Sequence, residues 1–279
     1  MDDPDAYKLS KALRGDNRAQ LIEEFAPKFN WRSDGKDSVL DIGCAGGNVT
    51  CDLILPKLPP TFSQLVGIDI CDNMVDYATK NYPIPKTSFK KLDIGADISE
   101  FKHAYGAFDH IISLFCFHLV PDQRQAIQNV YNLLGPGGNC FLHFICEYVA
   151  FDVYKETYPK WSEYMEDIDD FISPYYRRVD PASMIRKHVK NAGFSSYIVD
   201  ERRKWYAYHD VQLFKRAYAP VISFFSRIPV ERQEEYLDDF VMVALGVKPD
   251  PGVEVENFKA GQDVNIFVAY KTVIVFAQK

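Results

Sequence analysis

Short apolar runs alternate with helical patterns through the first half of the chain, and this alternation constrains the fold more than any other feature. Buried strands are predicted at residues 38–43, 65–70, 88–94 and 108–115, with helices beginning near Asn48, Asp72 and Asp122. The run 108–115 is apolar almost throughout, as expected of a central strand with both faces covered. Alternation of this kind is typical of an α/β protein with a parallel sheet.

The second half continues the pattern with two interruptions. After a helix that ends near Leu134, strands are predicted at 139–146, at 195–206 and, last, at 265–278, and a helix from Pro181 closes at Gly193. Residues 148–180 and 209–262 interrupt the alternation and are expected at the carboxyl edge of the sheet, where open α/β folds bind ligands. We expect a single domain over residues 1–279, with helical cap elements near 1–30, 148–180 and 209–262.

Charge and cysteine content restrict the partners and the location. A formal net charge of −7 over 279 residues is unlike that of general phosphate-backbone binders, so nucleic acid is not an expected partner. There is no apolar signal region at the start and no run of about 18 apolar residues, so neither a signal peptide nor a membrane span is expected. The six cysteines lack CxxC spacing, which argues against a metal site and favours a reducing compartment, the cytoplasm. A homodimer is left open.

The strongest motif is the segment Val39-Leu-Asp-Ile-Gly-Cys-Ala-Gly-Gly-Asn48. A strand ends in an acidic residue, and a glycine-rich turn then opens a helix whose first N–H groups are available to a ligand. In a dinucleotide enzyme such groups meet a pyrophosphate, but the spacing here is G-x-x-G-G rather than G-x-G-x-x-G. A nicotinamide-dependent oxidoreductase is therefore the weaker alternative.

This motif resembles the first motif of class I S-adenosylmethionine (SAM)-dependent methyltransferases. The resemblance covers about residues 36–146 and 181–208, and it includes the turns Leu133–Gly138 and Ala192–Phe194. It implies a Rossmann-like sheet of seven strands flanked by helices, with the last strand antiparallel between the fifth and sixth. It also implies that Asp41 binds the methionine ammonium, that Asp69 binds the ribose, and that Asp93 and Ile94 bind the adenine. The full cofactor set that we predict is Asp41, Gly43, Cys44, Ala45, Gly46, Asp69, Ile70, Met74, Asp93, Ile94 and Ser113.

The acceptor is indicated by a second, narrower resemblance. Nucleic acid amino-methyltransferases place an Asn/Asp-Pro-Pro-aromatic box after the fourth strand, where this chain has Ser113–His118. The chain is similar to insect juvenile hormone acid O-methyltransferases at Tyr7, Trp31–Gly35, Phe117-His118 with Asp122-Gln123, Phe151–Tyr154 and Asp170–Pro174. This resemblance spans most of the chain. It implies methylation of the carboxylate of a long apolar acid, of the farnesoic or juvenile hormone acid type.

That reaction requires polar side chains that hold the carboxylate, here called the clamp, within an apolar cavity. A carboxylate is ionised at neutral pH, so no general base is needed, and positioning with exclusion of water should carry the rate. We predict His118 as one arm of the clamp and Arg14 as the second; a structural His118 and a solvated Arg14 are the alternatives. The resemblance implies Gln near position 14 and Trp after the histidine, where this chain has Arg14 and Leu119.

Aromatic residues are expected to line the tail of the acceptor site, because apolar ligand pockets are built mainly from such side chains. The predicted contacts are Phe115, Tyr148, Phe151, Trp161, Ile172, Tyr206, Phe224 and Val243, each of which would serve equally as a core residue. Because Arg14 and Leu119 differ from the residues of the resembled family, two other functions are also consistent with the sequence. A paralogue that methylates another small acid, or a noncatalytic protein that binds SAM or an isoprenoid, also fits the sequence.

Overall fold

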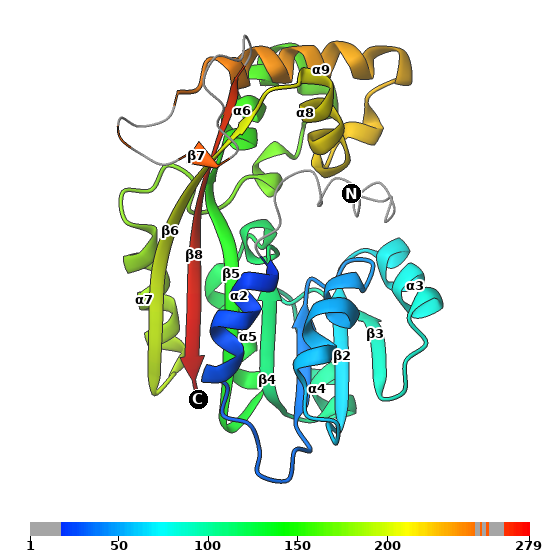
Figure 1. The fold of residues 1–279 in the computed structure, drawn as a ribbon, viewed down its shortest axis with the longest axis vertical. Helices are drawn as coiled ribbons and strands as arrows, with labels where there is room; N and C mark the ends of the chain where they lie inside the picture. Colours follow the sequence, from blue (N-terminus) through cyan, green and yellow to red (C-terminus); the bar gives the residue numbers. More distant parts are fainter. Residues whose placement is uncertain (1–17, 249–251, 253–254, 257–264) are drawn as a thin grey trace.

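A computed structural model describes residues 18–248, 252, 255–256 and 265–279. In these residues one mixed sheet runs through the molecule in the order β3-β2-β1-β4-β5-β8-β6-β7 (Figure 1). Its strands are β1 Ser38–Ile42, β2 Gln64–Asp69, β3 Thr87–Lys91, β4 Phe108–Leu114, β5 Leu134–Tyr148, β6 Ser196–Tyr208, β7 Val255–Glu256 and β8 Ile266–Gln278.

The topology confirms the predicted fold class and the position of the last long strand. Strands β1 to β5 pair in parallel, and β8 lies antiparallel between β5 and β6. The sheet has eight strands where seven were predicted, because Val255 and Glu256 pair in parallel with Trp205 and Tyr206 as a short β7. A two-residue strand carries no alternation of apolar and polar residues, so the sequence pattern could not reveal it.

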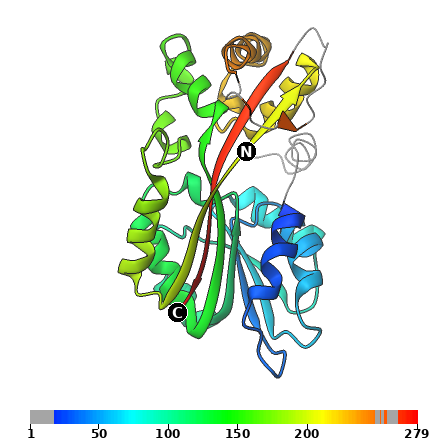
Figure 2. The same ribbon diagram turned by 60° about the vertical axis from the view of Figure 1, so that its left-hand side comes forward.

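Helices cover both faces of the sheet, as Figure 2 shows. One face packs against α4 Ser99–Tyr105, α5 Gln123–Leu133 and α7 Pro181–Ala192, through a large apolar core that includes Ile127, Val130, Ile185 and Val189. The other face packs against α2 Arg18–Phe25 through Leu21, Ile22 and Phe25, followed by the turn η1 Ala26–Lys28. Helix α3 Asp72–Asn81 packs beside β3 through Val75 and Ala78. This two-faced burial explains why the parallel strands read as nearly continuous apolar runs.

Local sequence signals set the helix ends. The Asp122 carboxylate accepts the backbone N–H of Gln125 at 2.8 Å, and the Asp180 carboxylate accepts that of Ser183 at 2.8 Å, so both residues cap a helix as predicted for Asp122. Gly193 closes α7 at a φ of 104°, which is a left-handed conformation that favours glycine. The helix predicted from Asn48 to Leu55 is distorted, with a π-helix η2 at Thr50–Ile54 and a 3-10 turn η3 at Leu55–Lys57 that contains Pro56.

The two insertions lie beyond the carboxyl ends of the strands, at the top of Figure 1. We call them the cap: residues 149–171, with α6 Val149–Trp161, η5 Ser162–Tyr164 and η6 Ile168–Phe171, and residues 211–245, with α8 Val211–Tyr218, η7 Ala219–Val221, η8 Phe225–Arg227 and α9 Val230–Leu245. The cap has an apolar core of its own, rich in Phe, Tyr and Trp. Among all described helices, none has both the length and the apolar character that crossing a bilayer requires.

Candidate active site

The turn after β1 is held to the end of β2 by backbone hydrogen bonds. The N–H groups of Gly43 and Cys44 donate to the Ile68 carbonyl at 2.8 and 3.0 Å, and the Ala45 N–H donates to the Asp69 carboxylate at 2.9 Å. Gly43 has a φ of 76° and Ala45 a φ of 47°, so the chain twice enters the left-handed region within three residues. The sheet therefore brings the predicted turn and the predicted ribose-binding carboxylate into direct contact.

Asp69 and Ile70, at the end of β2, form a surface that suits an adenosine. Burial raises the pKa of Asp69, an effect opposed by N–H donors that include Ala45 and Cys71, the latter at 3.0 Å. Since an ionised carboxylate has about four acceptor positions, capacity remains for the hydroxyls of a ligand. The neighbouring Ile70 side chain is 62% exposed, an apolar surface that a stacked ring would cover. These residues fit SAM.

Four other predicted cofactor residues are buried in β1, in the turn, in α3 and in β4. Asp41 is buried and accepts the Thr50 hydroxyl at 2.6 Å, which ties β1 to the distorted helix. The Ser113 hydroxyl donates to the Ile42 carbonyl at 2.9 Å, and this bond links β4 to β1. Cys44 and Met74 are buried, at 2% exposure each. Two of these side chains thus link β1 to the elements beside it, Asp41 to the distorted helix and Ser113 from β4.

The predicted adenine-binding pair lies beyond the strand that was expected to carry it. Strand β3 ends at Lys91, so Asp93 and Ile94 belong to the following loop. Asp93 is exposed and accepts the Gly95 N–H at 2.7 Å, whereas Ile94 is 3% exposed and packs in the main core. The loop passes close to Val120, whose methyl group would lie 3.3 Å from a Cβ at position 95.

Glycine at two positions of the first turn is required by packing. A Cβ at Gly43 would lie 2.4 Å from the Cβ of Cys116, and a Cβ at Gly47 would lie 3.0 Å from Ala78 and from the Phe89 ring. Gly47 also has a φ of 83°. Close approach of neighbouring elements therefore accounts for both glycines, even before a ligand is considered.

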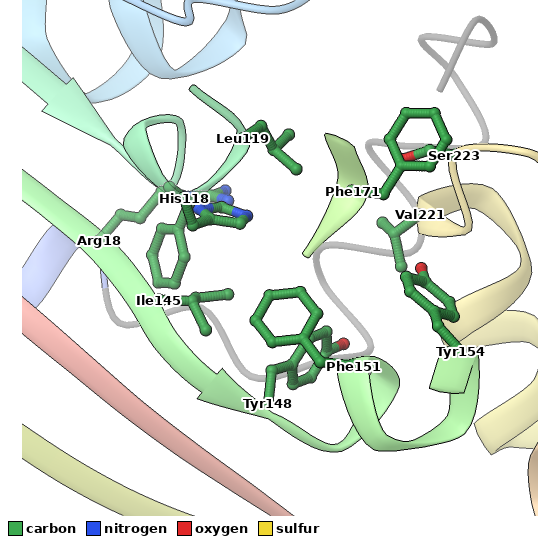
Figure 3. Close-up of a pocket in the computed structure, with 11 residues that line it drawn as sticks. Arg18, His118, Leu119, Ile145, Tyr148, Phe151, Tyr154, Phe171, Val221 and Ser223 are labelled. Atoms are coloured by element: carbon green, nitrogen blue, oxygen red, sulfur yellow. The ribbon is translucent and has the colours of Figure 1, made fainter. Parts of the chain in front are cut away.

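A pocket lies between the turn after β4 and the cap (Figure 3). The space between its lining residues amounts to about 530 Å³, a figure that includes the part open to solvent. Arg18 and His118 lie at one side of it and the cap residues Phe171, Val221 and Ser223 at the other. The lining residues that the structure describes are Arg18, Phe115, His118, Leu119, Ile145, Tyr148, Phe151, Tyr154, Phe171, Val221 and Ser223.

The structure brings four of the predicted acceptor residues together and leaves five apart. His118, on the turn η4 Phe117–Leu119, lines the pocket with Phe115, Tyr148 and Phe151. The other five are absent from the lining and lie in or against the apolar core of the cap: Trp161, Ile172, Tyr206, Phe224 and Val243. Trp161, for example, is fully buried, and its ring N–H donates to Asp239 of α9 at 2.8 Å. Arg14 lies outside the described residues.

Sequence reasoning missed Arg18 and Tyr154, although signals for both were available. Arg18 begins the buried stripe of α2 at the spacing i, i+3, i+4, i+7 with three apolar residues, and a charge in such a stripe points to a ligand or an ion pair. Tyr154 follows Phe151 by three residues, which places both on one face of α6.

Comparisons with known proteins agree with this geometry. Residues 40–142 match the family model described as a methyltransferase domain. Juvenile hormone acid O-methyltransferase of Drosophila melanogaster is 34% identical to the chain, over 100% of this chain and 93% of that protein. The protein of the same name from Bombyx mori is 35% identical, over 100% and 98% of the two chains.

Solved structures support the fold alone, because their sequence identity is low. The YcgJ protein of Bacillus subtilis superposes with a TM-score of 0.57 at 15% identity, covering 93% of this chain and 98% of that one. Phosphoethanolamine N-methyltransferase 2 of Haemonchus contortus gives a TM-score of 0.54 at 15% identity, with coverage of 98% and 56%. Because its full length aligns with two curated relatives at more than 30% identity, the chain belongs to the juvenile hormone acid O-methyltransferases, a family of SAM-dependent methyltransferases.

Proposed function

We propose that this enzyme methylates the carboxylate of an apolar isoprenoid or fatty acid, of the juvenile hormone acid or farnesoic acid type, to give the methyl ester. The observation that carries the proposal is the division of the pocket. Two nitrogen-rich side chains, Arg18 and His118, lie at one side, and most of the remaining lining is aliphatic or aromatic. A carboxylate at the polar side would extend its tail toward the cap.

The segment after β4 connects the proposed cofactor turn with the wall of the pocket. Cys116 packs against Gly43, and His118 follows Cys116 by two residues on η4. The acceptor head group would therefore lie close to the reacting end of the cofactor. SAM, when bound, supplies a methyl group on a positively charged sulfur.

Little acid–base chemistry is needed from the protein. The acceptor carboxylate is already ionised at neutral pH, so one of its oxygens can form the new bond to the methyl carbon as the bond to sulfur breaks, and no proton moves. A hydrogen bond from His118 to the other carboxylate oxygen would fix its direction of attack. The apolar cap would exclude water from the reacting groups.

The six cysteines support action in a reducing compartment, and we place the enzyme in the cytoplasm. All six are free thiols, and burial raises the pKa of Cys51, Cys140 and Cys146 to about 12 each. Such thiols stay protonated at neutral pH and are poor nucleophiles for disulfide exchange. The proposed partner is the small acid alone, without nucleic acid, and a homodimer remains open.

Incubation with methyl-labelled SAM tests the proposal. The panel contains farnesoic acid, a juvenile hormone acid and straight-chain fatty acids, with farnesol as the matched compound that lacks the carboxylate. We expect labelled methyl ester from at least one acid and no labelled ether from farnesol. If folded enzyme that binds SAM forms no ester from any of the acids, the proposed acceptor class is wrong.

A further inference from the structure

The polar side of the pocket contains a buried arginine. Arg18, the first residue of α2, is 5% exposed and lines the pocket from the side opposite the cap residues. It is the only residue with a permanent charge among the eleven described lining residues, and none of the eleven is acidic. A permanent positive charge in an apolar site favours an anionic ligand over a neutral one of the same shape.

The Arg18 guanidinium packs against the ring of Phe115, a residue whose backbone conformation is unfavourable. The guanidinium carbon lies 4.7 Å from the centre of the Phe115 ring. Phe115 has a φ of 60°, a left-handed conformation that a bulky residue rarely adopts. Its N–H donates to the His143 carbonyl at 2.7 Å, which holds this conformation against β5. Strain of this kind collects at functional sites, where the surrounding structure maintains it.

The Phe115 ring also contacts a buried, uncharged histidine, His143. The His143 ring meets the Phe115 ring edge-on, with centres 4.5 Å apart, and it is 1% exposed. Burial, followed by the nearby cations Arg18 and Arg202, lowers the pKa of His143 to about 3. His143 is therefore neutral at physiological pH and adds no positive charge beside the Phe115 ring.

We propose that Arg18 recognises the carboxylate of the acceptor and makes the pocket specific for an acid head group. Phe115 is the positioning residue, because its ring packs against the Arg18 guanidinium. This inference rests on the proposed function and deepens it. The guanidinium carries five N–H donors in a planar fork, and a carboxylate takes two of them in a bidentate pair. Arg18 thus supplies charge and direction, while His118 supplies a single hydrogen bond.

The test compares the binding of an acid with that of its neutral copy. Farnesoic acid and its primary amide are titrated by calorimetry into enzyme saturated with S-adenosylhomocysteine, so that no turnover occurs. Arg18→Gln should weaken binding of the acid about 30-fold or more and that of the amide less than about threefold, since only the acid loses an ion pair. Arg216→Gln, on the exposed face of α8, is the control with the same charge change and should alter neither.

Arg18→Lys and two variants of Phe115 complete the test. Arg18→Lys should retain part of the preference for the acid, because the charge remains while the planar fork is lost. Phe115→Leu should weaken acid binding about 3-fold to 30-fold, whereas Phe115→Tyr, which keeps the ring face, should restore it. In each variant an unchanged affinity for S-adenosylhomocysteine shows that the protein is folded.

The possible results separate this inference from the proposed function. If the wild type forms no ester from any acid, the function fails. If it forms esters but Arg18→Gln weakens acid and amide equally, or weakens neither, Arg18 has a structural role and the inference is overturned while the function stands.

Discussion

His143 should lower the free energy of unfolding at acidic pH, and replacing it should remove this contribution. The imidazole is 1% exposed, and neither ring nitrogen has a hydrogen-bond partner among the described residues. Its pKa is about 3 in the folded protein, against about 6.5 in an unfolded chain. Because the folded pKa is the lower one, the unfolded chain binds the proton first as the pH falls below 6.5. Stability from this residue is therefore fully present at pH 8 and is lost progressively toward pH 3.

The size of the effect follows from these two values. At pH 5 the unfolded imidazole is protonated about 30 to 1 while the folded one stays neutral, which lowers the free energy of unfolding by about 2 kcal/mol relative to pH 8. His143→Phe cannot bind this proton. Any cost or gain in packing from the larger ring is the same at both pH values, so it cancels in the comparison between them.

Urea unfolding of wild type and His143→Phe at pH 8 and pH 5 measures the effect. The wild type should lose about 2 kcal/mol more than the variant between the two pH values. His103→Phe, on the exposed surface of α4, is the matched control, and its loss should equal that of the wild type within about 0.5 kcal/mol. An equal loss in His143→Phe and wild type would refute the conclusion that His143 is neutral in the folded protein.

Three further substitutions test the cofactor turn, the clamp and the base of the sheet. Asp69→Asn removes a charge and turns an amide group toward the N–H of Ala45 or Cys71, so the Kd for SAM measured by calorimetry should rise about 100-fold, and an unchanged Kd would contradict the assignment. Asp72→Asn, at an exposed pair with Lys91, is the control and should change the Kd less than about threefold. His118→Ala should lower kcat about 10-fold to 100-fold with the Kd for SAM unaltered, and full activity would make His118 a structural residue. His110→Ala should lower the free energy of unfolding by about 3–5 kcal/mol in urea melts, since the ring leaves a cavity and the buried Asp37 carboxylate loses the ring nitrogen 2.9 Å away while it keeps the Arg32 N–H; a loss below about 1 kcal/mol would argue against a structural role for this contact.

The grouping of the proposed cofactor residues could be predicted because they stand at the ends of neighbouring strands. Asp41, Gly43 and Asp69 occur at strand ends, and parallel pairing brings neighbouring strand ends together without any knowledge of side-chain packing. The differences arise where regular geometry gives way. Nothing in the apolar pattern distinguishes a π-helix at residues 50–54 from an α-helix, or shows that β3 ends before Asp93.

The acceptor side could be predicted only in part, because composition does not tell a pocket wall from a core. Trp161 and Tyr154 are both aromatic residues of α6, yet Tyr154 lines the pocket while Trp161 packs against Tyr236 of α9 with ring centres 5.2 Å apart. Which face of α6 meets α9 depends on the docking of the two segments of the cap, and these are separated by about 40 residues of sequence. Arg18 differs from these aromatic residues, because it occupies the first position of the buried face of α2 and a charged side chain interrupts the apolar pattern there.

The pocket divides between two parts of the structure, and this division has a consequence for specificity. Arg18, Phe115 and His118 belong to α2, to the residue after β4 and to η4, which pack on or directly follow the sheet. Phe171, Val221 and Ser223 belong to the cap, which has its own apolar core. The proposed head-group contacts therefore rest on the same strands that hold the turn after β1, so we expect a change there to disturb the reacting geometry. We expect substitutions in the cap to alter the shape and length of the accepted tail while the proposed acid head group stays in place.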